Sequence, residues 1–174
     1  MKTQIFSRDR LQPALLDRLI DERPDSQALE TAEQRVISKI KLRQSVLRDL
    51  NWLLNATGGI FDLEPSKNAH ALRSVLNFGL PPLSGLLVSK IEMTGLENWI
   101  RQAILDFEPR IVPSTLVVRG VEAENPLAHH NAVVFEITGQ LWAQPYPLDV
   151  LFKTSVDLET GSTRVDDPGL LAVE

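Results

Sequence analysis

The tetrapeptide Phe107-Glu108-Pro109-Arg110 places a carboxylate and a guanidinium on either side of a proline. Pro109 disfavours helical backbone at Glu108, so a helix that leads into this motif must end here. A carboxylate could act as a general acid in glycoside hydrolysis if it were held protonated. Arg110 counts against that chemistry, because a nearby cation favours the ionised carboxylate. The pair is therefore either a clasp within the fold or a docking point for a partner.

Other residues with chemical potential do not form a site. His70 is isolated, and His129 and His130 are adjacent, so on an extended chain their side chains point apart and do not share a metal. The chain has no cysteine, which excludes disulfides and thiolate metal sites. Gly58-Gly59 follows a predicted helix rather than a strand, so it is not a phosphate-binding loop. We predict no catalytic residue and no cofactor.

Two long helices are predicted to position the motif. The first, over 31–55, begins with a capping box at Thr31 and Gln34 and ends before Gly58-Gly59. Its polar face is basic and is typical of a solvated surface. The second helix, over 94–107, has a capping box at Thr94 and Glu97 and a continuous apolar stripe. That stripe consists of Leu96, Ile100, Ala103, Ile104 and Phe107.

Two shorter helices are also expected. An amphipathic helix over 11–22 carries a leucine stripe that must be buried, either on the body of the protein or on a partner. A second one over 69–78 follows a loop and should end at Gly79. Its apolar residues Leu72, Val75 and Leu76 are predicted to point inward.

Beyond Phe107 the apolar period changes from 3.6 to 2, which is typical of strands with one buried face. We predict strands over 112–121, 131–141 and 148–158, with the last two joined as a hairpin around Gln144 and Pro145. Helices followed by strands indicate an α+β fold: N-terminal helices, then an antiparallel three-stranded sheet packed on them.

The 174 residues, 43% hydrophobic and 24% charged, suit one soluble globular domain. We divide the chain into an N-terminal helix and linker (1–27), a main domain (28–165) and a mobile tail (166–174).

Charge is unevenly distributed along the chain. Residues 1–119 carry 16 Lys and Arg against 14 Asp and Glu, whereas residues 120–174 carry 2 against 9. The acidic part argues against nucleic-acid binding and fits either a basic partner or a role in solubility. No segment reads as a signal peptide or as a membrane span, so we expect a cytoplasmic protein without direct membrane insertion.

Four motifs in order carry a resemblance to a known family: Leu15-Leu16-Asp17-Arg18-Leu19, Ser45-Val46-Leu47-Arg48-Asp49-Leu50, Ser74-Val75-Leu76-Asn77-Phe78-Gly79-Leu80 and Glu108-Pro109-Arg110. Together they resemble TssE, the small baseplate subunit of the bacterial type VI secretion system, a family shared with the lysozyme-like wedge protein of contractile phage tails. The chain departs from the family at Asn51 and at the residues from Ala56 to Gly59, where members of the family commonly have charged residues.

The resemblance implies a non-enzymatic subunit that links the baseplate wedge to the contractile sheath and nucleates sheath assembly. Its implied partners are the baseplate subunits TssF, TssG and TssK and the sheath proteins TssB and TssC, at the cytoplasmic face of the inner membrane. The alternatives are a peptidoglycan hydrolase, and a wedge protein of a phage tail or related injection particle.

The candidate protein-binding residues fall into two groups. Because of the resemblance we favour docking for Glu108, Pro109 and Arg110, and we add Arg48 and Asp49 from the second motif. The other group is the hairpin, where Val150 and Phe152 mark a strand whose open edge could pair with a sheath strand.

Overall fold

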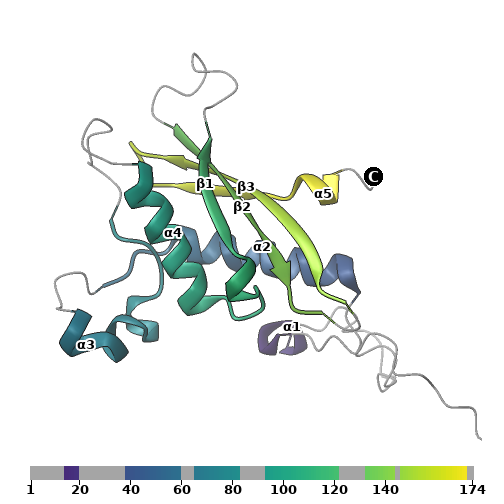
Figure 1. Ribbon diagram of the computed structural model, residues 1–174, viewed down its shortest axis with the longest axis horizontal. Coiled ribbons are helices and arrows are strands. Elements are labelled where there is room, and N and C mark those ends of the chain that lie inside the picture. Colours follow the sequence, from purple (N-terminus) through teal and green to yellow (C-terminus); the bar gives the residue numbers. More distant parts are fainter. Residues whose placement is uncertain are drawn as a thin grey trace, which may run out of the picture.

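The computed structural model describes residues 14–19, 38–59, 65–82, 93–121, 132–143 and 146–171. Its centre is one antiparallel sheet in the order β1-β2-β3-β4 (Figure 1). The strands are β1 (Val117–Val121), β2 (Ala132–Leu141), β3 (Leu148–Asp157) and β4 (Thr163–Asp166). The helices are α1 (Leu15–Leu19), α2 (Lys39–Asn55), α3 (Pro65–Leu72), α4 (Met93–Phe107) and α5 (Pro168–Leu171), with 3-10 turns η1 (Val75–Asn77) and η3 (Pro113–Thr115). None of the helices in these ranges has the length and apolar character needed to cross a bilayer.

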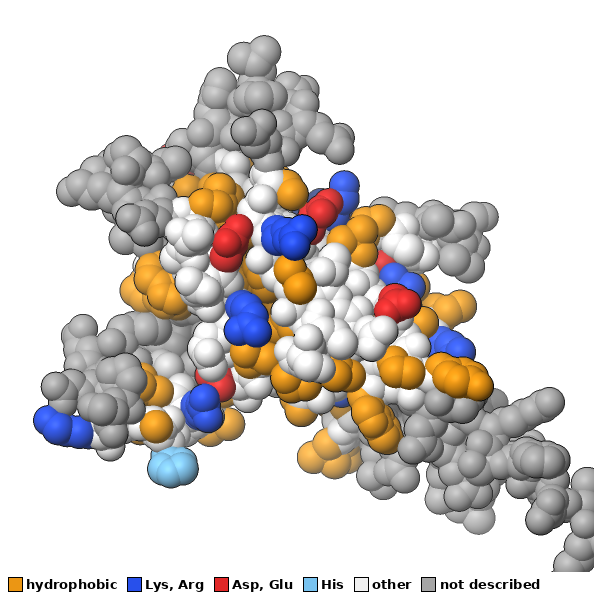
Figure 2. All heavy atoms as spheres, in the orientation of Figure 1, with side chains coloured by type: hydrophobic (Ala, Val, Ile, Leu, Met, Phe, Trp, Pro, Cys, Tyr) orange, Lys and Arg blue, Asp and Glu red, His pale blue; other side chains and the backbone are white. Residues whose placement is uncertain are grey.

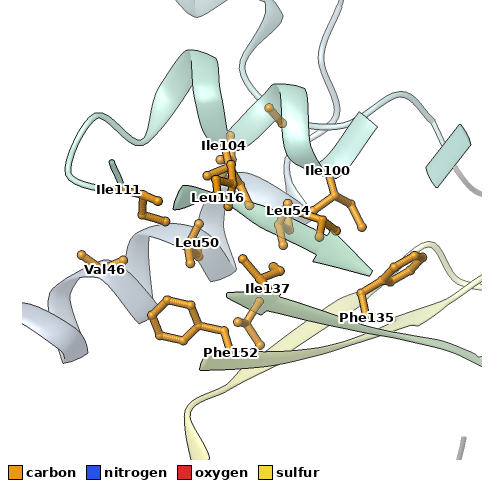
Figure 3. Packing of buried hydrophobic residues seen from close by; sticks show 14 of the residues in the cluster. Val46, Leu50, Leu54, Ile100, Ile104, Ile111, Leu116, Phe135, Ile137 and Phe152 are labelled. Carbon is orange, nitrogen blue, oxygen red and sulfur yellow. The ribbon is translucent and has the colours of Figure 1, made fainter. Parts of the chain in front are cut away.

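One face of the sheet forms the core together with α2 and α4. The register places Ile137 of β2 beside Phe152 of β3, and both side chains are almost fully buried. Alternation then puts Glu136 of β2 and Asp149 and Lys153 of β3 on the opposite face, whereas Thr154 lies on the core side and is fully buried. Helix α4 packs mainly against β1 and helix α2 against β4, so the two helices cover the two halves of the buried face (Figure 3).

The α+β class is confirmed, but the prediction of three strands was wrong. β4 has four residues, too few to show a clear period, and it follows a tight turn in which Gly161 has a φ of 74°. Helices are also not confined to the N-terminal part, because α5 follows the sheet. The segment expected to be a tail is packed at its start: Asp166 ends β4 and Asp167 is 3% exposed.

The two long helices are present with different starts. Ser38 caps α2 by accepting a hydrogen bond from the backbone N–H of Lys41 at 3.1 Å, whereas the predicted box at Thr31 and Gln34 lies outside the described residues. The box predicted at Thr94 is wrong, because Thr94 lies inside α4. Glu97 instead accepts a hydrogen bond from the N–H of Gly120 in β1 at 2.7 Å.

The segment 65–82 differs most from expectation. Helix α3 starts at Pro65, within the predicted loop, and it stops at Leu72. Proline is tolerated at the first helical position because the N–H that it lacks would have no partner within the helix. The amide of Asn77 donates to the carbonyl of Leu72 at 3.0 Å, which closes the chain into η1 rather than another helical turn. Val75 and Leu76 were predicted to point inward, but they are 82% and 71% exposed.

The first predicted strand is shorter than 112–121. Pro113 begins η3, and the hydroxyl of Thr115 donates to the carbonyl of Val112 at 2.8 Å, so pairing with β2 as a strand starts only at Val117. The predicted hairpin is confirmed by the pairing of Leu141 with Leu148, although Gln144 and Pro145 lie outside the described residues.

Candidate functional site

Glu108 and Arg110 pair with each other at the end of α4. The N–H of Glu108 makes the last helical hydrogen bond, to Ile104 at 2.8 Å, and Pro109 then turns the chain. The Nε of Arg110 donates to Oε1 of Glu108 at 2.7 Å, and its second terminal nitrogen donates to Oε2 at 2.6 Å. The backbone N–H of Arg110 also donates to Oε1, at 3.1 Å. Glu108 is 5% exposed, so this carboxylate is bound and buried by its own turn.

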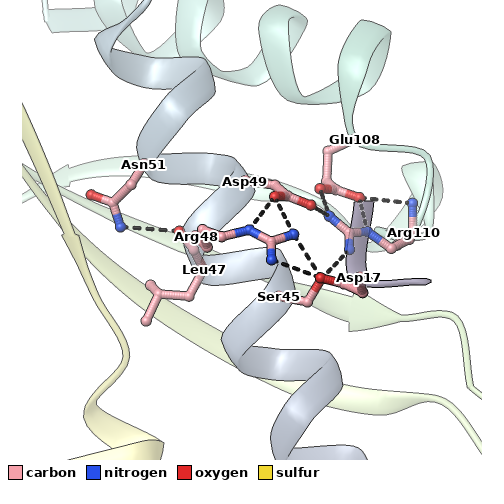
Figure 4. A network of polar contacts seen from close by, with 8 residues as sticks. All are labelled: Asp17, Ser45, Leu47, Arg48, Asp49, Asn51, Glu108 and Arg110. Atoms are coloured by element: carbon pink, nitrogen blue, oxygen red, sulfur yellow. Dashed lines mark hydrogen bonds and ion pairs between the residues drawn. The ribbon is translucent and has the colours of Figure 1, made fainter. Parts of the chain in front are cut away.

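Arg110 also joins this turn to α2 (Figure 4). Its guanidinium donates to the hydroxyl of Ser45 at 2.9 Å and to Oδ2 of Asp49 at 2.5 Å. Burial lowers the pKa of Arg110, but hydrogen bonds and charge from Glu108, and then from Asp49, raise it above its ordinary value. The guanidinium is thus held charged between two carboxylates that belong to different helical segments.

Arg48 extends the cluster from α2 to α1. Its Nε donates to Asp49 at 2.9 Å, and a terminal nitrogen donates to Oδ1 of Asp17 at 2.6 Å. Ser45 donates its hydroxyl proton to Oδ2 of Asp17, also at 2.6 Å. The guanidinium of Arg48 lies over the ring of Trp52 at 5.1 Å, which adds a cation–π contact.

α1 is held on the body by this polar contact with its leucines facing outward. Asp17 points into the cluster, whereas Leu15 and Leu19 are 73% and 74% exposed. The predicted leucine stripe is therefore not buried on the described body of the protein. Of the wider predicted helix 11–22, only residues 14–19 are described.

The predicted docking residues separate into two places. Glu108, Arg110, Arg48 and Asp49 come together, and Pro109 sits exposed at their turn. Val150 and Phe152 lie elsewhere, in the core, at 6% and 0% exposed. A partner strand at this place can reach only the backbone of β3.

Sequence reasoning did not single out four residues that make polar contacts between elements: Asp17, Ser45, Asn51 and Asn55. Ser45 and Asp49 are four apart on α2, and so are Asn51 and Asn55, a spacing that places side chains on one helix face. That spacing was a usable signal, although it does not reveal what the face contacts.

Asn51 and Asn55 close the outer edge of β4. The amide of Asn51 accepts from the N–H of Val165 at 3.0 Å and donates to its carbonyl at 3.1 Å. Asn55 does the same with Thr163, at 2.9 and 2.6 Å. At the opposite edge of the sheet, the side chain of Glu97 accepts a hydrogen bond from the N–H of Gly120. Side chains of the helices therefore satisfy backbone groups at both outer strands.

No group of three His, Cys, Asp or Glu residues that could hold a metal ion occurs within the described ranges. The described residues form an α+β domain in which a cluster of largely covered charged side chains ties α1, α2 and the end of α4 together.

The chain belongs to the baseplate wedge protein gp25 family, whose family model matches residues 40–146. The match spans α2 through the end of β2 and includes the whole of the cluster except Asp17. A comparison with curated proteins and one with solved structures gave no match.

Proposed function

We propose that this protein is a TssE-type baseplate subunit of a type VI secretion system, which links the wedge to the contractile sheath and nucleates sheath assembly. Family membership supports a baseplate role. The observation that carries the sheath role is an open stretch of strand edge on β3, since unpaired backbone groups can take up a partner strand.

The open stretch follows from the register of the sheet. β4 pairs only with residues 153–156 of β3, so the first half of β3 has no strand on that side. The backbone groups of Thr163 and Val165 turn away from β3 to reach Asn55 and Asn51, so Arg164 and Asp166 must bond with β3.

By the same alternation, the backbone groups of Asp149 and Leu151 point outward on the β4 side, while those of Val150 point to β2. α5 lies near β3, but no described residue gives a backbone hydrogen bond to Asp149 or Leu151 on this side.

Replacing Asp149 with proline tests this edge. The side chain is exposed and its N–H points away from β2, so the β2–β3 ladder should survive while one outward donor is lost. We expect a folded protein that no longer supports sheath assembly in cells carrying the intact system. Asp149→Ala is the matched control, because it also removes the contact with Gln140 but keeps the N–H.

The same substitution at Val150 or Phe152 does not test the edge. Both residues direct their backbone to β2 and their side chains to the core, so proline there would disrupt the fold itself. Normal sheath assembly with folded Asp149→Pro would contradict the edge as the sheath contact.

The proposed partners in the wedge are TssF, TssG and TssK, at the cytoplasmic face of the inner membrane, and TssB and TssC in the sheath. A pull-down from cells with the complete system, comparing wild type with Asp149→Pro, should lose TssB and TssC but keep the wedge subunits. Genes for phage structural proteins beside this gene would favour the alternative of a phage-tail wedge.

We also propose that the protein is not a hydrolase. Both oxygens of Glu108 accept hydrogen bonds from Arg110, and the carboxylate is buried, so it is poorly placed to protonate a sugar oxygen. Purified protein should give no clearing in a peptidoglycan zymogram. A clearing zone that disappears in Glu108→Gln would overturn this proposal.

A further inference from the structure

Val75 and Leu76 form an exposed apolar pair that the core does not explain. They are 82% and 71% exposed, and η1 has no buried residue. Neighbouring Phe78, by contrast, packs edge-on against Phe107, with ring centroids 5.3 Å apart. We call the two exposed side chains the Val75–Leu76 knob.

The backbone beneath the knob is held firmly. The N–H of Asn77 donates to Ser74 at 2.9 Å, and the hydroxyl of Ser74 donates to Ala71 at 2.7 Å. Further along, Gly79 adopts a φ of 121° and approaches the carbonyl of Ala56, to which the N–H of Leu80 donates at 2.9 Å. A turn ordered in this way presents its side chains with little ordering cost left for binding.

The segment that carries the knob has only basic charged residues. Residues 65–82 contain Lys67 and Arg73 and no Asp or Glu. Both basic residues are exposed, Arg73 with 69% of its side chain. Its ion-pair partner Asp106 is largely covered, at 14%. Figure 2 shows hydrophobic and basic side chains gathered with a histidine at the corner of the molecule that α3 occupies.

We propose that the Val75–Leu76 knob is an interaction surface that inserts into an apolar pocket rimmed by carboxylates on a neighbouring baseplate subunit. Two adjacent aliphatic side chains supply the apolar contact, and the basic residues Lys67 and Arg73 of the same segment match an acidic rim. The inference rests on the proposed function, because it takes the neighbour to be a subunit of the same wedge.

The test uses the full chain and the purified complex of the remaining wedge subunits encoded with it, with binding followed by biolayer interferometry. Val75→Ser/Leu76→Ser should weaken binding about tenfold or more, as loss of an interface anchor does. Its thermal midpoint should stay unchanged, because both side chains are already exposed.

Ile40→Ser is the matched control for the loss of exposed apolar surface. Ile40 is 48% exposed and lies at the far end of α2, about 24 Å along the helix from the end that contacts the loop of Gly79. This variant should bind as wild type.

The charged rim is tested by association rates at low salt. Arg73→Glu should slow association, and the effect should shrink as salt is added. Arg164→Glu is the control, since Arg164 on β4 is also exposed and paired to a carboxylate at a similar distance, 3.1 Å against 3.3 Å.

Each of the other possible outcomes overturns a specific part of the proposal. Wild-type binding by the double serine variant would remove the knob from the interface and leave the proposed function standing. A lowered thermal midpoint would show that the chain's own residues cover the knob, and would equally overturn the proposal. An unaltered rate for Arg73→Glu would exclude the acidic rim. Failure of the wild-type chain itself to bind the wedge subunits would sink the proposed function along with the inference.

Discussion

Asn51 of α2 pairs with Val165 of β4 as a neighbouring strand would, accepting from its N–H at 3.0 Å and donating to its carbonyl at 3.1 Å. Asn55 repeats the pattern with Thr163. The geometry works because four helical residues rise about 6 Å, close to the ~6.7 Å spanned by two residues of a strand. A helix thus supplies the missing partner of an edge strand.

Removing either asparagine amide should destabilise the protein. Asn51→Ala and Asn55→Ala each leave a backbone N–H and C=O of β4 without their side-chain partner. Each should lower the free energy of unfolding by about 1–3 kcal/mol, which urea unfolding can measure. Asn98→Ala is the control, because Asn98 is exposed on α4 and alanine there should be neutral or slightly stabilising.

The double variant, Asn51→Ala with Asn55→Ala, should also self-associate, because it exposes a strand edge. Light scattering should show the apparent mass rising with protein concentration. A monomeric double variant with wild-type stability would show that these contacts contribute nothing.

Two glycines should respond oppositely to alanine. At Gly79 a new Cβ would overlap the carbonyl of Ala56 on a backbone with positive φ, so Gly79→Ala should cost about 1–3 kcal/mol or more. At Gly95, within α4, no described atom beyond the adjoining residues and the helix's own backbone lies within 4 Å of the added Cβ, so Gly95→Ala should stabilise by roughly 0.5–1 kcal/mol. Thermal melts of the two variants make the comparison, and shifts of the same sign would contradict this account of the Gly79 turn.

Arg110→Ala distinguishes a clasp from a docking residue. The guanidinium bonds Glu108, Asp49 and Ser45, so its loss strands a buried carboxylate and should cost about 3–5 kcal/mol, or roughly 10 °C in the melting midpoint. Adding Glu108→Gln to that variant should recover part of the loss, because the uncompensated charge is gone. An unshifted midpoint together with lost partner binding would favour docking instead.

The attachment of α1 to α2 should depend on pH. Burial raises the pKa of Asp17, but hydrogen bonds from Ser45 and Arg48 and the charge of Arg48 lower it more, to below its ordinary value of 3.8. Because this pKa is depressed, the ionised Asp17 stabilises the attachment of α1 above about pH 4. That stabilisation is lost as the pH falls through the lowered pKa.

That release can be followed with a label on α1. The chain has no cysteine, so Leu19→Cys, at an exposed position, takes a single fluorophore. Its anisotropy should fall in acid below pH 3.8, at the lowered pKa of Asp17. Adding Asp17→Asn should give low anisotropy at neutral pH as well. High anisotropy in that variant would mean that contacts other than the carboxylate hold α1.

The parts predicted well from the sequence are those with a long apolar period, namely α4 and the hairpin of β2 and β3. β4 was missed because its period is too short to see. The direction of Val75 and Leu76 was predicted wrongly, because a period shows that residues share a face but not that the face is covered.

The charged cluster was only half predictable. The sequence places Arg110 beside Glu108, but nothing in it shows that the chain brings Arg110 to Asp49, which is 61 positions away. Such convergence depends on how α4 packs across α2, and that is a property of the tertiary fold.

The bidentate ion pair of Arg43 with Asp167, at 2.8 and 2.6 Å, joins residues 124 positions apart. Because Asp167 is only 3% exposed and lies just after β4, α2 cannot complete its contacts until the chain through Asp167 has left the ribosome. A nascent chain stalled or cut before Asp167 would keep Arg43 without this partner. Translation that ends early should therefore yield a product that proteases remove rather than a shortened subunit able to compete for a place in the particle.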